Sequence, residues 1–487
     1  MFNPTQETID AMKGAQVNAL SDGISKAYTQ ATGLVNYDLQ PVALNLYPVL
    51  TPLRNRIPRV SGDGGTATNW KAVTGINTTN ISIGVSEGQR GGVQTQTTVD
   101  KTAAYRGIGL EDSVTFEADY AGTGFDDIKA KAAVRLLQSV MVAEERLLTG
   151  GNSSIALGVT PTATVVGSGT GGTLAAQTMS VICVALTLEG LRASTVSGGL
   201  PLSGTRTNAD ASTDSVNAGT AQKSASATAV LSGSTSSATA TVTVVNGAVA
   251  YAWFWGVAGS ELLGAITSLN TVAITAAATG TQNASAGFTA DKSANSLVFD
   301  GLLTQIQTVG SGAYVVSLPT LAGVGTALTS DGAGGIVEIE TAFDSFWTNY
   351  RLSPSDIDVS GKTLLAMNKL IIANGGAPLI RYTNDNLQGG QMTAGTVIAS
   401  YLNKITNTTV KINVMPEMPD GMVMFFSRSV SYPLNGVGNI LQVKTRRDYY
   451  QTEWPLRTRK YEYGVYADQL LQNYFPPAFG LIRNVKV

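Results

Sequence analysis

The most regular hydrophobic pattern in the chain runs through residues 122–151. Its apolar side chains recur at steps of three and four, the spacing of one face of an α-helix; they are Phe125, Ile128, Ala132, Leu136, Val140, Ala143 and Leu147. Thr123 can cap the start, and Gly150 with Gly151 can end it. The pattern predicts one helix roughly 35 Å long, either the spine of an elongated subunit or a buried core helix of a large enzyme.

Four acidic residues lie toward the ends of this predicted helix. Asp126 and Asp127 fall in its first turn, where the helix dipole favours negative charge. Glu144 and Glu145 fall on the side that we assign to solvent. We therefore interpret all four as surface charge and not as a pair of catalytic carboxylates.

The segment before this helix is rich in Thr, Val and Ile with partial alternation, which predicts a long β-hairpin over residues 61–110. Its limbs are residues 66–85 and 93–110, and its tip is a glycine-rich turn that carries Glu87 and Arg90. No third strand is predicted beside it. Such a ribbon is unstable alone in water, so we expect it to lie on another molecule. The predicted helix follows after Glu111 and Asp112.

Two segments precede the hairpin. Residues 1–40 have a weak helical period, and they are too short and polar to fold alone, which predicts an arm that needs a partner surface. Residues 41–60 contain several prolines, which predicts a rigid extended strip and not a helix. Arg54, Arg56 and Arg59 lie on this strip, either as solvated surface or as ion pairs across a subunit boundary.

Residues 156–290 contain few charges and short apolar runs separated by Gly, Ser and Thr clusters, which is typical of a β-sandwich. The expected strands are residues 174–188, 241–245, 248–256 and 272–275. Between the first two of these lies a Ser/Thr/Ala-rich stretch, residues 205–240, that we interpret as a long loop or exposed edge.

The run at 248–256 alternates large aromatic side chains with smaller ones, which places Tyr251, Trp253 and Trp255 on one face. We interpret this face as packing core, with a sugar-binding platform as the alternative. The single cysteine, Cys183, lies in an apolar run and is expected to be a buried thiol.

Mixed α and β patterns follow in residues 297–440. A helix is predicted to begin in 297–306, and others over 335–350 and 362–374; strands are predicted over 410–414 and 422–426. The stripe expected to pack the second helix consists of Ile336, Ile339, Phe343, Trp347 and Tyr350.

The end of the chain, residues 441–487, interleaves aromatic residues with arginines. Arg446, Arg447 and Trp454 belong to residue types that are enriched at interface hot spots. The same composition also suits stacking on single-stranded nucleic acid. Nearby acids offset much of the basic charge, so we favour a protein interface.

Composition excludes several function classes. The net charge of −2 argues against a strongly basic nucleic-acid binder. Only 14% of the residues are charged, fewer than a dispersed monomer normally carries, so neighbouring subunits are expected to cover much of the surface. The chain has no histidine, which removes Ser-His-Asp and Cys-His catalysis and His-ligated zinc. We predict no catalytic residue, cofactor site or metal site.

Short motifs and targeting segments in the sequence do not point to a cofactor site, a metal site or a membrane segment. Residues 167–172 match GxGxxG, but a β-like run follows where a dinucleotide site needs a helix. Residues 331–335 are too short for a calcium loop and are expected to form a turn. No signal peptide is visible, and the longest apolar run, 248–258, is too short to span a bilayer.

The order of these elements resembles the major capsid protein of tailed double-stranded DNA phages, the Hong Kong 97-type fold. The segments most similar to the family are LNLYPVLTPLRNRIPRV, FDDIKAKAAVRLLQSVMVAEERLLTGG, GAGGIVEIETAFDSFWTNYRLSP and the closing PPAFGLI. The resemblance implies an α+β fold in several parts: an N-terminal arm (1–40), a peripheral domain (41–60, 111–155 and 441–487), an extended loop (61–110), an axial domain (291–440) and an inserted immunoglobulin- or fibronectin-like sandwich (156–290).

The resemblance also implies a function. Hexamers and pentamers of the chain would close an icosahedral shell around DNA, which the shell contacts without reading sequence. A separate scaffolding protein, a portal and a decoration protein would be partners, and the virion, made in a bacterial cytoplasm, would be the location. The inter-subunit contact candidates are Glu87, Arg90, Arg54, Arg56, Arg59, Arg446, Arg447 and Trp454.

Two other functions stay open from the sequence. A β-rich surface adhesin or other extracellular structural protein fits the low charge and the sandwich-like middle, although no secretion signal and a long helix count against it. A glycosidase that uses two carboxylates would need a defined acid pair, and no spacing in the chain indicates one.

Overall fold

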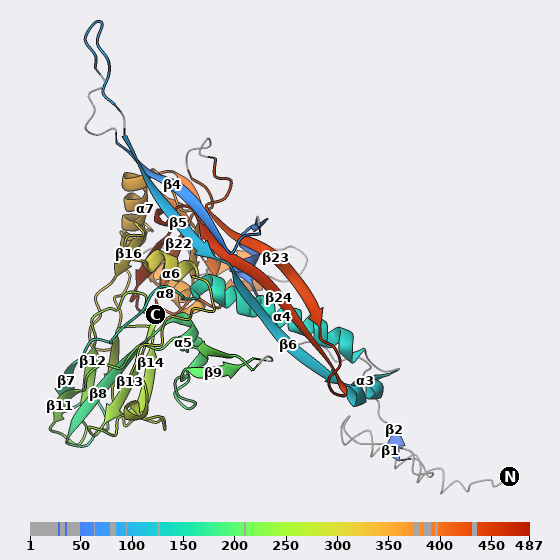
Figure 1. The fold of residues 1–487 in the computed structure, drawn as a ribbon. Helices are drawn as coiled ribbons and strands as arrows, with labels where there is room; N and C mark the ends of the chain where they lie inside the picture. The colour runs from blue at the N-terminus through green and yellow to red at the C-terminus, as the bar shows by residue number, and fades with distance from the viewer. Residues whose placement is uncertain are drawn as a thin grey trace. The chain divides into compact units, whose positions relative to one another are not determined.

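A computed structural model describes most of the chain, in two compact units (Figure 1). The described residues are 28–29, 35–36, 49–62, 64–77, 84–93, 95–123, 127–208, 211–373, 380–383, 391–394, 398–430 and 436–487. The first unit comprises residues 1–48, 112–135 and 454–462, and the second comprises 49–111, 136–453 and 463–487.

The first unit contains a short helix, α3 (Phe116–Gly122), and a small antiparallel pair, β1 (Tyr28–Thr29) with β2 (Val35–Asn36). Thr115 begins α3, because its hydroxyl accepts a hydrogen bond from the backbone N–H of Ala118 (3.3 Å). Residues 1–40 were expected to have a weak helical period. Within them Tyr28 lies in strand β1, and most of the expected helical stretch lies outside the described residues.

The long helix is present as α4 (Ile128–Gly150), but it begins later than predicted. Strand β6 (Arg106–Thr115), which contains Glu111 and Asp112, and helix α3 both stand before it. Thr123 ends α3 and does not cap α4, whereas Asp127 accepts a hydrogen bond from the N–H of Ala130 (2.9 Å). Phe125 and Asp126 lie outside the described residues.

The buried face of α4 differs from the predicted stripe. Leu136, Val140 and Leu148 are buried, and Glu144 continues the same line at a spacing of four residues. Ala143, which we placed on the apolar face, is exposed. The placement of Glu144 and Glu145 on the solvent side was therefore wrong: the buried line passes through Glu144, and Glu145 beside it is buried as well.

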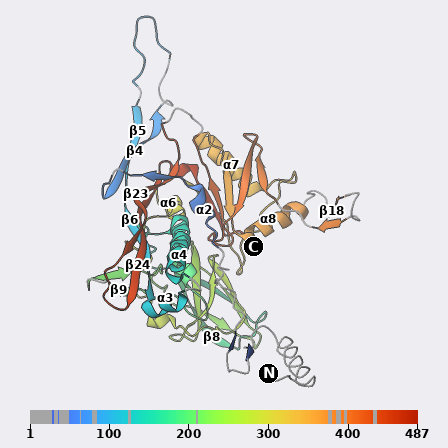
Figure 2. The same cartoon turned by 90° about the vertical axis from the view of Figure 1, so that its right-hand side faces the viewer.

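The proline-rich strip contains a helix, which corrects the expectation of a wholly extended segment. Helix α2 (Pro52–Arg56) has Pro52 in its first turn, where the missing N–H costs nothing. A strand after it, β3 (Arg59–Ser61), joins a four-stranded sheet in the order β3-β23-β24-β6, which Figures 1 and 2 show side by side. The two long strands are β23 (Leu441–Glu453) and β24 (Lys460–Asn473).

The predicted hairpin is confirmed as a two-stranded ribbon of β4 (Ala67–Asn77) and β5 (Thr95–Ala104), paired antiparallel. In the turn at its tip, Gln89 N–H donates to the carbonyl of Ser86 (3.0 Å), and Gly88 has φ +76°, a conformation that favours glycine. The second limb ends earlier than predicted, because the chain passes at Tyr105 into β6 of another sheet.

Two antiparallel sheets pack face to face in the middle of the chain. One has the order β11-β8-β13-β14, and the other has the order β15-β12-β7. Their strands are β7 (Thr164–Ser168), β8 (Gln177–Leu186), β11 (Ala227–Leu231), β12 (Ser237–Thr241), β13 (Ala250–Gly256), β14 (Leu262–Thr267) and β15 (Thr271–Ile274). The residues predicted to form a sandwich therefore do form two stacked sheets.

The core between these sheets contains the aromatic face that the alternation predicted. Tyr251, Trp253 and Trp255 are buried there, together with Cys183, whose burial raises the pKa of its thiol well above the usual value. These aromatic side chains are core and not an exposed platform. Residues 205–240, expected as a long loop or exposed edge, contribute to four strands. Of these, β11 lies at the edge of its sheet, as the second alternative has it, whereas β12 is the central strand of the other sheet.

The remaining elements around these sheets are short. They are the antiparallel pair β9 (Gly204–Thr207) with β10 (Thr213–Val216), helix α5 (Leu188–Ala193), and the 3-10 helix η1 (Ala284–Ala286). The strand expected over 241–245 is instead β12, which ends at Thr241.

A mixed six-stranded sheet forms the other large layer of the second unit, in the order β16-β25-β22-β17-β21-β20. Its strands are β16 (Tyr314–Ser317), β25 (Gly480–Arg483), β22 (Val423–Phe426), β17 (Asp356–Val359), β21 (Thr408–Val414) and β20 (Ser400–Asn403). The 3-10 helix η2 (Pro476–Ala478) leads into β25. The last strand of the chain therefore lies in this sheet and not beside β23 and β24.

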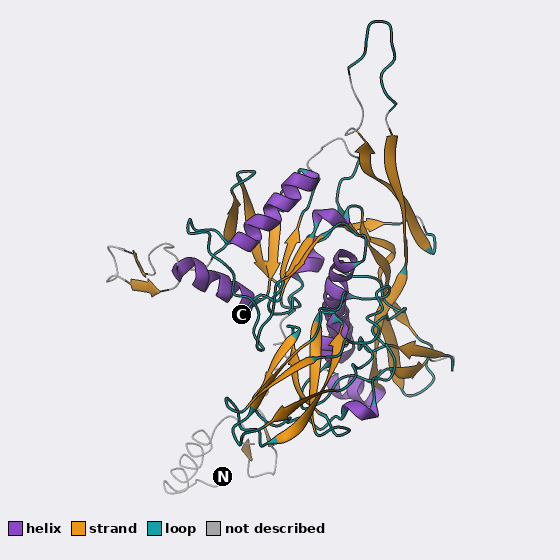
Figure 3. Cartoon of the chain, turned by 90° about the vertical axis from the view of Figure 1, so that its left-hand side faces the viewer, coloured by secondary structure: helices purple, strands orange, loops and turns teal. Residues whose placement is uncertain are grey.

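Helices pack beside the six-stranded sheet (Figure 3). They are α6 (Leu302–Gln307), α7 (Val337–Tyr350) and α8 (Gly361–Ala373), and the pair β18 (Ile380–Thr383) with β19 (Gln391–Ala394) follows α8. In α7 the buried side chains are Ile339, Ala342, Phe343 and Phe346. Trp347, predicted on that stripe, is 38% exposed, because Phe346 occupies the place against Phe425 (ring centroids 5.8 Å apart).

Candidate functional site

The polar residues that the fold brings together most densely surround helix α2. Two adjacent acids of α4, Glu144 and Glu145, are 0% and 1% exposed. Burying a carboxylate is costly unless donors surround it. The three arginines of the proline-rich strip supply much of that environment, and we call the resulting network the α2 clamp: Arg54, Arg56 and Arg59 with the carboxylates of Glu144, Glu145 and Asp358.

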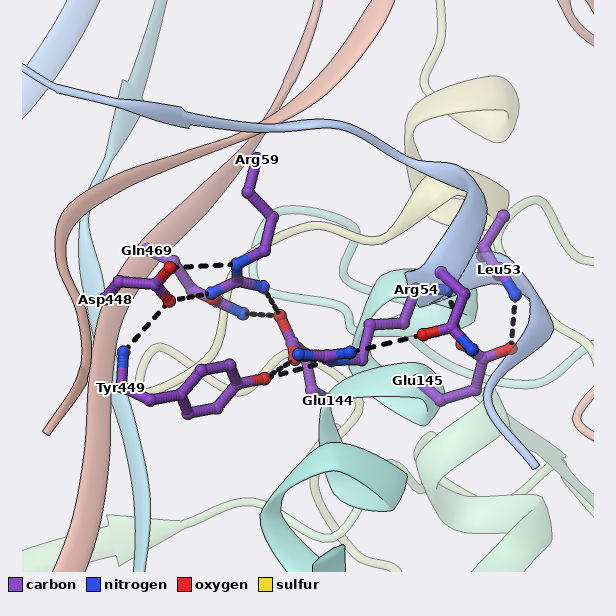
Figure 4. A network of polar contacts seen from close by, with 9 residues as sticks. Leu53, Arg54, Arg59, Glu144, Glu145, Asp448, Tyr449 and Gln469 are labelled. Carbon is purple, nitrogen blue, oxygen red and sulfur yellow. Dashed lines mark hydrogen bonds and ion pairs between the residues drawn. The ribbon is translucent and has the colours of Figure 1, made fainter. Parts of the chain in front are cut away.

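Glu144 is the centre of the clamp (Figure 4). Its Oε1 accepts from Arg59 Nη1 (2.5 Å) and from Gln469 Nε2 (2.7 Å). Its Oε2 accepts from Arg54 Nε (2.7 Å) and from the Tyr449 hydroxyl. Both oxygens are thus fully engaged by donors from α2, β3, β23 and β24, so one buried carboxylate holds four segments together.

Tyr449 supports the arginines as well as the carboxylate. Its ring lies beneath the guanidinium groups of Arg54 and Arg59, 5.2 and 4.8 Å from their central carbons, which adds cation–π attraction. Burial and the nearby Glu144 charge raise the pKa of Tyr449 to about 12. The outer side of Arg59 pairs with Asp448 (2.6 Å). Burial raises the pKa of that carboxyl, but hydrogen bonds from Arg59 and from the Tyr449 N–H, together with the charges of Arg59 and Arg54, outweigh burial and leave the pKa lowered.

Glu145 caps helix α2 from a distant part of the chain. Its Oε1 and Oε2 accept from the backbone N–H groups of Leu53 (2.9 Å) and Arg54 (2.6 Å). These N–H groups lack partners inside a helix, and Thr51, at the N-cap, makes no side-chain cap bond. Burial raises the pKa of Glu145, although the two backbone bonds oppose that shift.

The third arginine connects α2 to the six-stranded sheet. Arg56 forms a bidentate pair with Asp358 on β17, with distances of 2.7 and 2.5 Å, and its guanidinium lies 4.1 Å above the ring of Phe426. Asp356 lies two residues earlier on the same strand and binds Arg428 through both carboxylate oxygens (2.8 and 2.9 Å). Helix α2 is therefore tied both to α4 and to β17.

The depressed pKa of Asp356 predicts that the stability of the subunit is sensitive to acid. Burial raises its pKa, but hydrogen bonds from Arg428, Ser355 and Asn413 outweigh burial and hold the pKa at about 2. A carboxyl whose pKa is depressed from about 3.9 in the unfolded chain contributes stability above that value and loses it as the pH falls toward 2. We expect the stability of the subunit to decrease from about pH 4 to pH 2, and that decrease to be shallower in Asp356→Asn.

Urea denaturation of the unassembled subunit at a series of pH values measures this effect. The matched control is Asp100→Asn, because Asp100 is exposed and pairs with an exposed lysine at 3.6 Å. The control should follow the original protein at every pH. An equally steep acid decrease in Asp356→Asn would contradict the prediction.

The clamp's glutamates are engaged in holding segments together. Each oxygen of Glu144 and Glu145 already accepts a hydrogen bond from the same chain. Within the described part of the chain, no group of three or more acidic, cysteine or histidine side chains is placed to hold a metal ion. In those same residues, no helix has the length and apolarity needed to cross a bilayer.

The structure places the other predicted contact residues on the surface. Glu87 and Arg90 are exposed in the turn of the ribbon, between the exposed side chains of Val85 and Val93. The three clamp arginines, in contrast, have carboxylate partners in their own chain, so a role for them between subunits stays a prediction.

The candidates near the end of the chain are also exposed. Arg446 pairs with Asp468 (3.0 Å), and Arg447 lies 3.8 Å above the ring of Tyr450. Trp454, in the first unit, is 41% exposed. An exposed tryptophan and stacked arginines fit the interface predicted for this region, which stays a prediction.

Sequence reasoning missed the acidic half of the clamp. The signal was present in the four-residue spacing of Leu136, Val140, Glu144 and Leu148, which places the acid in line with buried leucines and valine. A polarity pattern read alone assigns such a glutamate to solvent. The closely spaced Arg54, Arg56 and Arg59 were a second signal, because clustered arginines need acidic partners elsewhere in the chain if they are buried.

Comparisons with known proteins give no sequence match and several distant structural ones. No family model and no curated protein matches the chain. The capsid of the native GTA particle has a TM-score of 0.44 at 10% identity, over 93% of this chain and 96% of that one. The SrpI encapsulin of Synechococcus elongatus has a TM-score of 0.40 at 8% identity, over 93% and 92%.

A third similar structure, the capsid of Myoviridae phage XM1, has a TM-score of 0.40 at 8% identity, over 92% of this chain and 96% of that one. All three TM-scores are below 0.5. Similarity at this level assigns neither a fold family nor a function by itself.

Proposed function

We propose that this chain is the major capsid protein of a tailed phage, and that many copies assemble into an icosahedral shell around double-stranded DNA. The proposal rests on the order of the described elements, namely a ribbon, a long helix and mixed sheets. The residues 156–290 would then be an inserted immunoglobulin- or fibronectin-like sandwich, and residues 291–440 the axial domain.

The β4–β5 ribbon carries the proposal. Among the residues that the structure describes, its two strands pair with each other and with no third strand, and the described side chains of β5 are mostly exposed. Its tip presents Val85 at 54% and Val93 at 87% exposure. A two-stranded ribbon is marginally stable in water without a supporting surface, and the two exposed valines fit a contact of the tip with such a surface. A neighbouring copy in a closed shell supplies that surface.

The interior of the subunit supports the same function. The α2 clamp fixes the proline-rich strip to α4 and to β17 through buried charge pairs with defined geometry. Such pairs favour one arrangement of their segments over others. A subunit that repeats the same contacts many times around a shell needs such fixed geometry, whereas the clamp leaves no carboxylate free for catalysis.

The proposal includes the partners expected of such a shell. These are further copies of the chain in hexamers and pentamers, a separate scaffolding protein, a portal and a decoration protein. Packaged DNA would meet a nearly neutral wall, since the chain carries a net charge of −2. The protein would be made in the bacterial cytoplasm and would reside in the virion capsid.

Negative-stain electron microscopy of the purified protein, alone and with its candidate scaffold, tests the proposal. Closed shells or rings of five and six subunits are the expected result. A dispersed monomer under every condition, including with scaffold, would contradict it and would favour the β-rich surface adhesin.

A further inference from the structure

A cleft of about 430 Å³ lies at the root of the ribbon, between β4, β5, β24 and the segment around α6. Part of its lining is apolar and includes Phe299, Leu470 and Pro476, with the exposed Val309 also in the lining. The rest of its lining is polar, and that part is rich in hydrogen-bond donors. The cleft shares no residue with the α2 clamp.

Two cations of this cleft have no anionic partner within the described part of the chain. Lys101 stands directly opposite Trp70 in the register of the ribbon, and Arg106 follows at the start of β6. Both are half-buried, and neither forms an ion pair with any residue that the structure describes. Because burial is not offset by a nearby anion, it lowers the pKa of Lys101.

Two neutral donors in the same lining are also unpaired. Trp70 Nε1–H and the side-chain amide of Asn473 are shielded from solvent and have no acceptor among the described residues. Asn473 is 3% exposed, and its carbonyl oxygen accepts from the N–H of Phe475 (3.1 Å), which leaves only its N–H₂ group free. Buried donors without acceptors are rare in folded proteins, and each is destabilising.

Asp300, the acidic residue of the lining, accepts its hydrogen bonds from other groups and not from these donors. Asp300 Oδ1 accepts from Ser153 N–H (2.7 Å), Ser153 Oγ (2.9 Å) and Ser154 N–H (3.1 Å). Its charge is therefore compensated locally by the loop after α4. The lining as a whole combines two unpaired cations and two unpaired N–H donors with one acid that is already engaged.

We propose that this cleft is a binding site for a carboxylate attached to a short apolar stem. The carboxylate would accept from Lys101, Arg106 and the Trp70 indole, and the stem would lie against the apolar lining. Such a group has two sources: an aspartate or glutamate side chain of a second copy of the chain, which rests on the proposed function, or a free small dicarboxylate.

Titration of the unassembled subunit with glutarate tests the site. We expect saturable binding, read by calorimetry and by a change in tryptophan fluorescence that is lost in Trp70→Phe. Glutaramide, which has the same shape without charge, should not bind. Lys101→Met should weaken binding by at least about tenfold, since a charge-assisted hydrogen bond is lost.

The matched control is Lys71→Met on the neighbouring position of β4. Lys71 is 80% exposed and pairs with Asp100, outside this cleft, so its removal should leave glutarate binding unchanged. No saturable binding, equal binding of glutaramide, or equal loss in both lysine variants would overturn the proposal.

A second arm distinguishes the two sources. If a second copy supplies the carboxylate, assembled particles should no longer bind glutarate, and saturating glutarate should slow assembly. If assembled particles bind glutarate as the free subunit does, the ligand is a free carboxylate. Glutarate binding by a subunit that never assembles would support the site while contradicting the capsid function, so the two failures are distinguishable.

Discussion

Replacing Glu144 by glutamine is expected to lower the free energy of unfolding by about 3–5 kcal/mol, the usual result of removing one partner from a buried ion pair. The glutamine amide would turn an N–H₂ group toward donors where a carboxylate oxygen now accepts. Arg54 and Arg59 would remain buried, with side chains only 12% and 19% exposed. Chemical denaturation of the unassembled subunit measures the loss.

The control for this variant is Glu117→Gln. Glu117 pairs with Arg459 at 2.8 Å, but both side chains are well exposed, so water screens the pair. We expect that change to cost less than about 1 kcal/mol. Equal stability of Glu144→Gln and the original protein would show that the α2 clamp does not contribute to folding as its geometry indicates.

Shortening the ribbon is expected to abolish assembly while leaving the subunit folded. Asn77 and Thr95 face each other in the ribbon, so replacing residues 78–94 with Asn-Gly closes the strands with a two-residue hairpin turn. The described tip residues, 84–93, are exposed. We therefore expect little change in unfolding, but no shells in electron microscopy.

A second hairpin in the chain provides the control. Thr207 and Thr213 are also partners, so replacing residues 208–212 with Asn-Gly shortens the β9–β10 hairpin by the same chemistry. Shells should still form from that variant. Shells of normal size from the shortened ribbon would contradict the proposal that the ribbon lies on a neighbour.

Elements with a strong local period were predictable from the sequence. Helix α8 and strands β13, β21 and β22 begin and end within about two residues of their predicted bounds. The alternation in β13 also gave the correct face for Trp253, and the glycines around residue 88 gave the turn of the ribbon. Spacing and turn chemistry act within a few residues, so they can be read from a short window.

Other elements depended on partners far along the chain. Helix α2 is capped by Glu145, which is 92 residues from Leu53, and no local residue caps it. Trp347 was placed in the core because its spacing allowed it, but the neighbouring Phe346 takes that position against Phe425. A helical stripe several residues wide offers more apolar side chains than a given surface accepts.

The candidate site likewise has a part that was predictable from the sequence and a part that only the tertiary structure decided. From the sequence alone, the arginines of the proline-rich strip were either solvated surface or ion pairs across a subunit boundary, and the ribbon was a segment without a third strand. Only the tertiary structure decided that Arg54 meets Glu144, 90 residues away, and that Arg56 meets Asp358, 302 residues away. Polarity along a chain reports what a side chain is, whereas burial of a charge depends on whether distant donors converge on it.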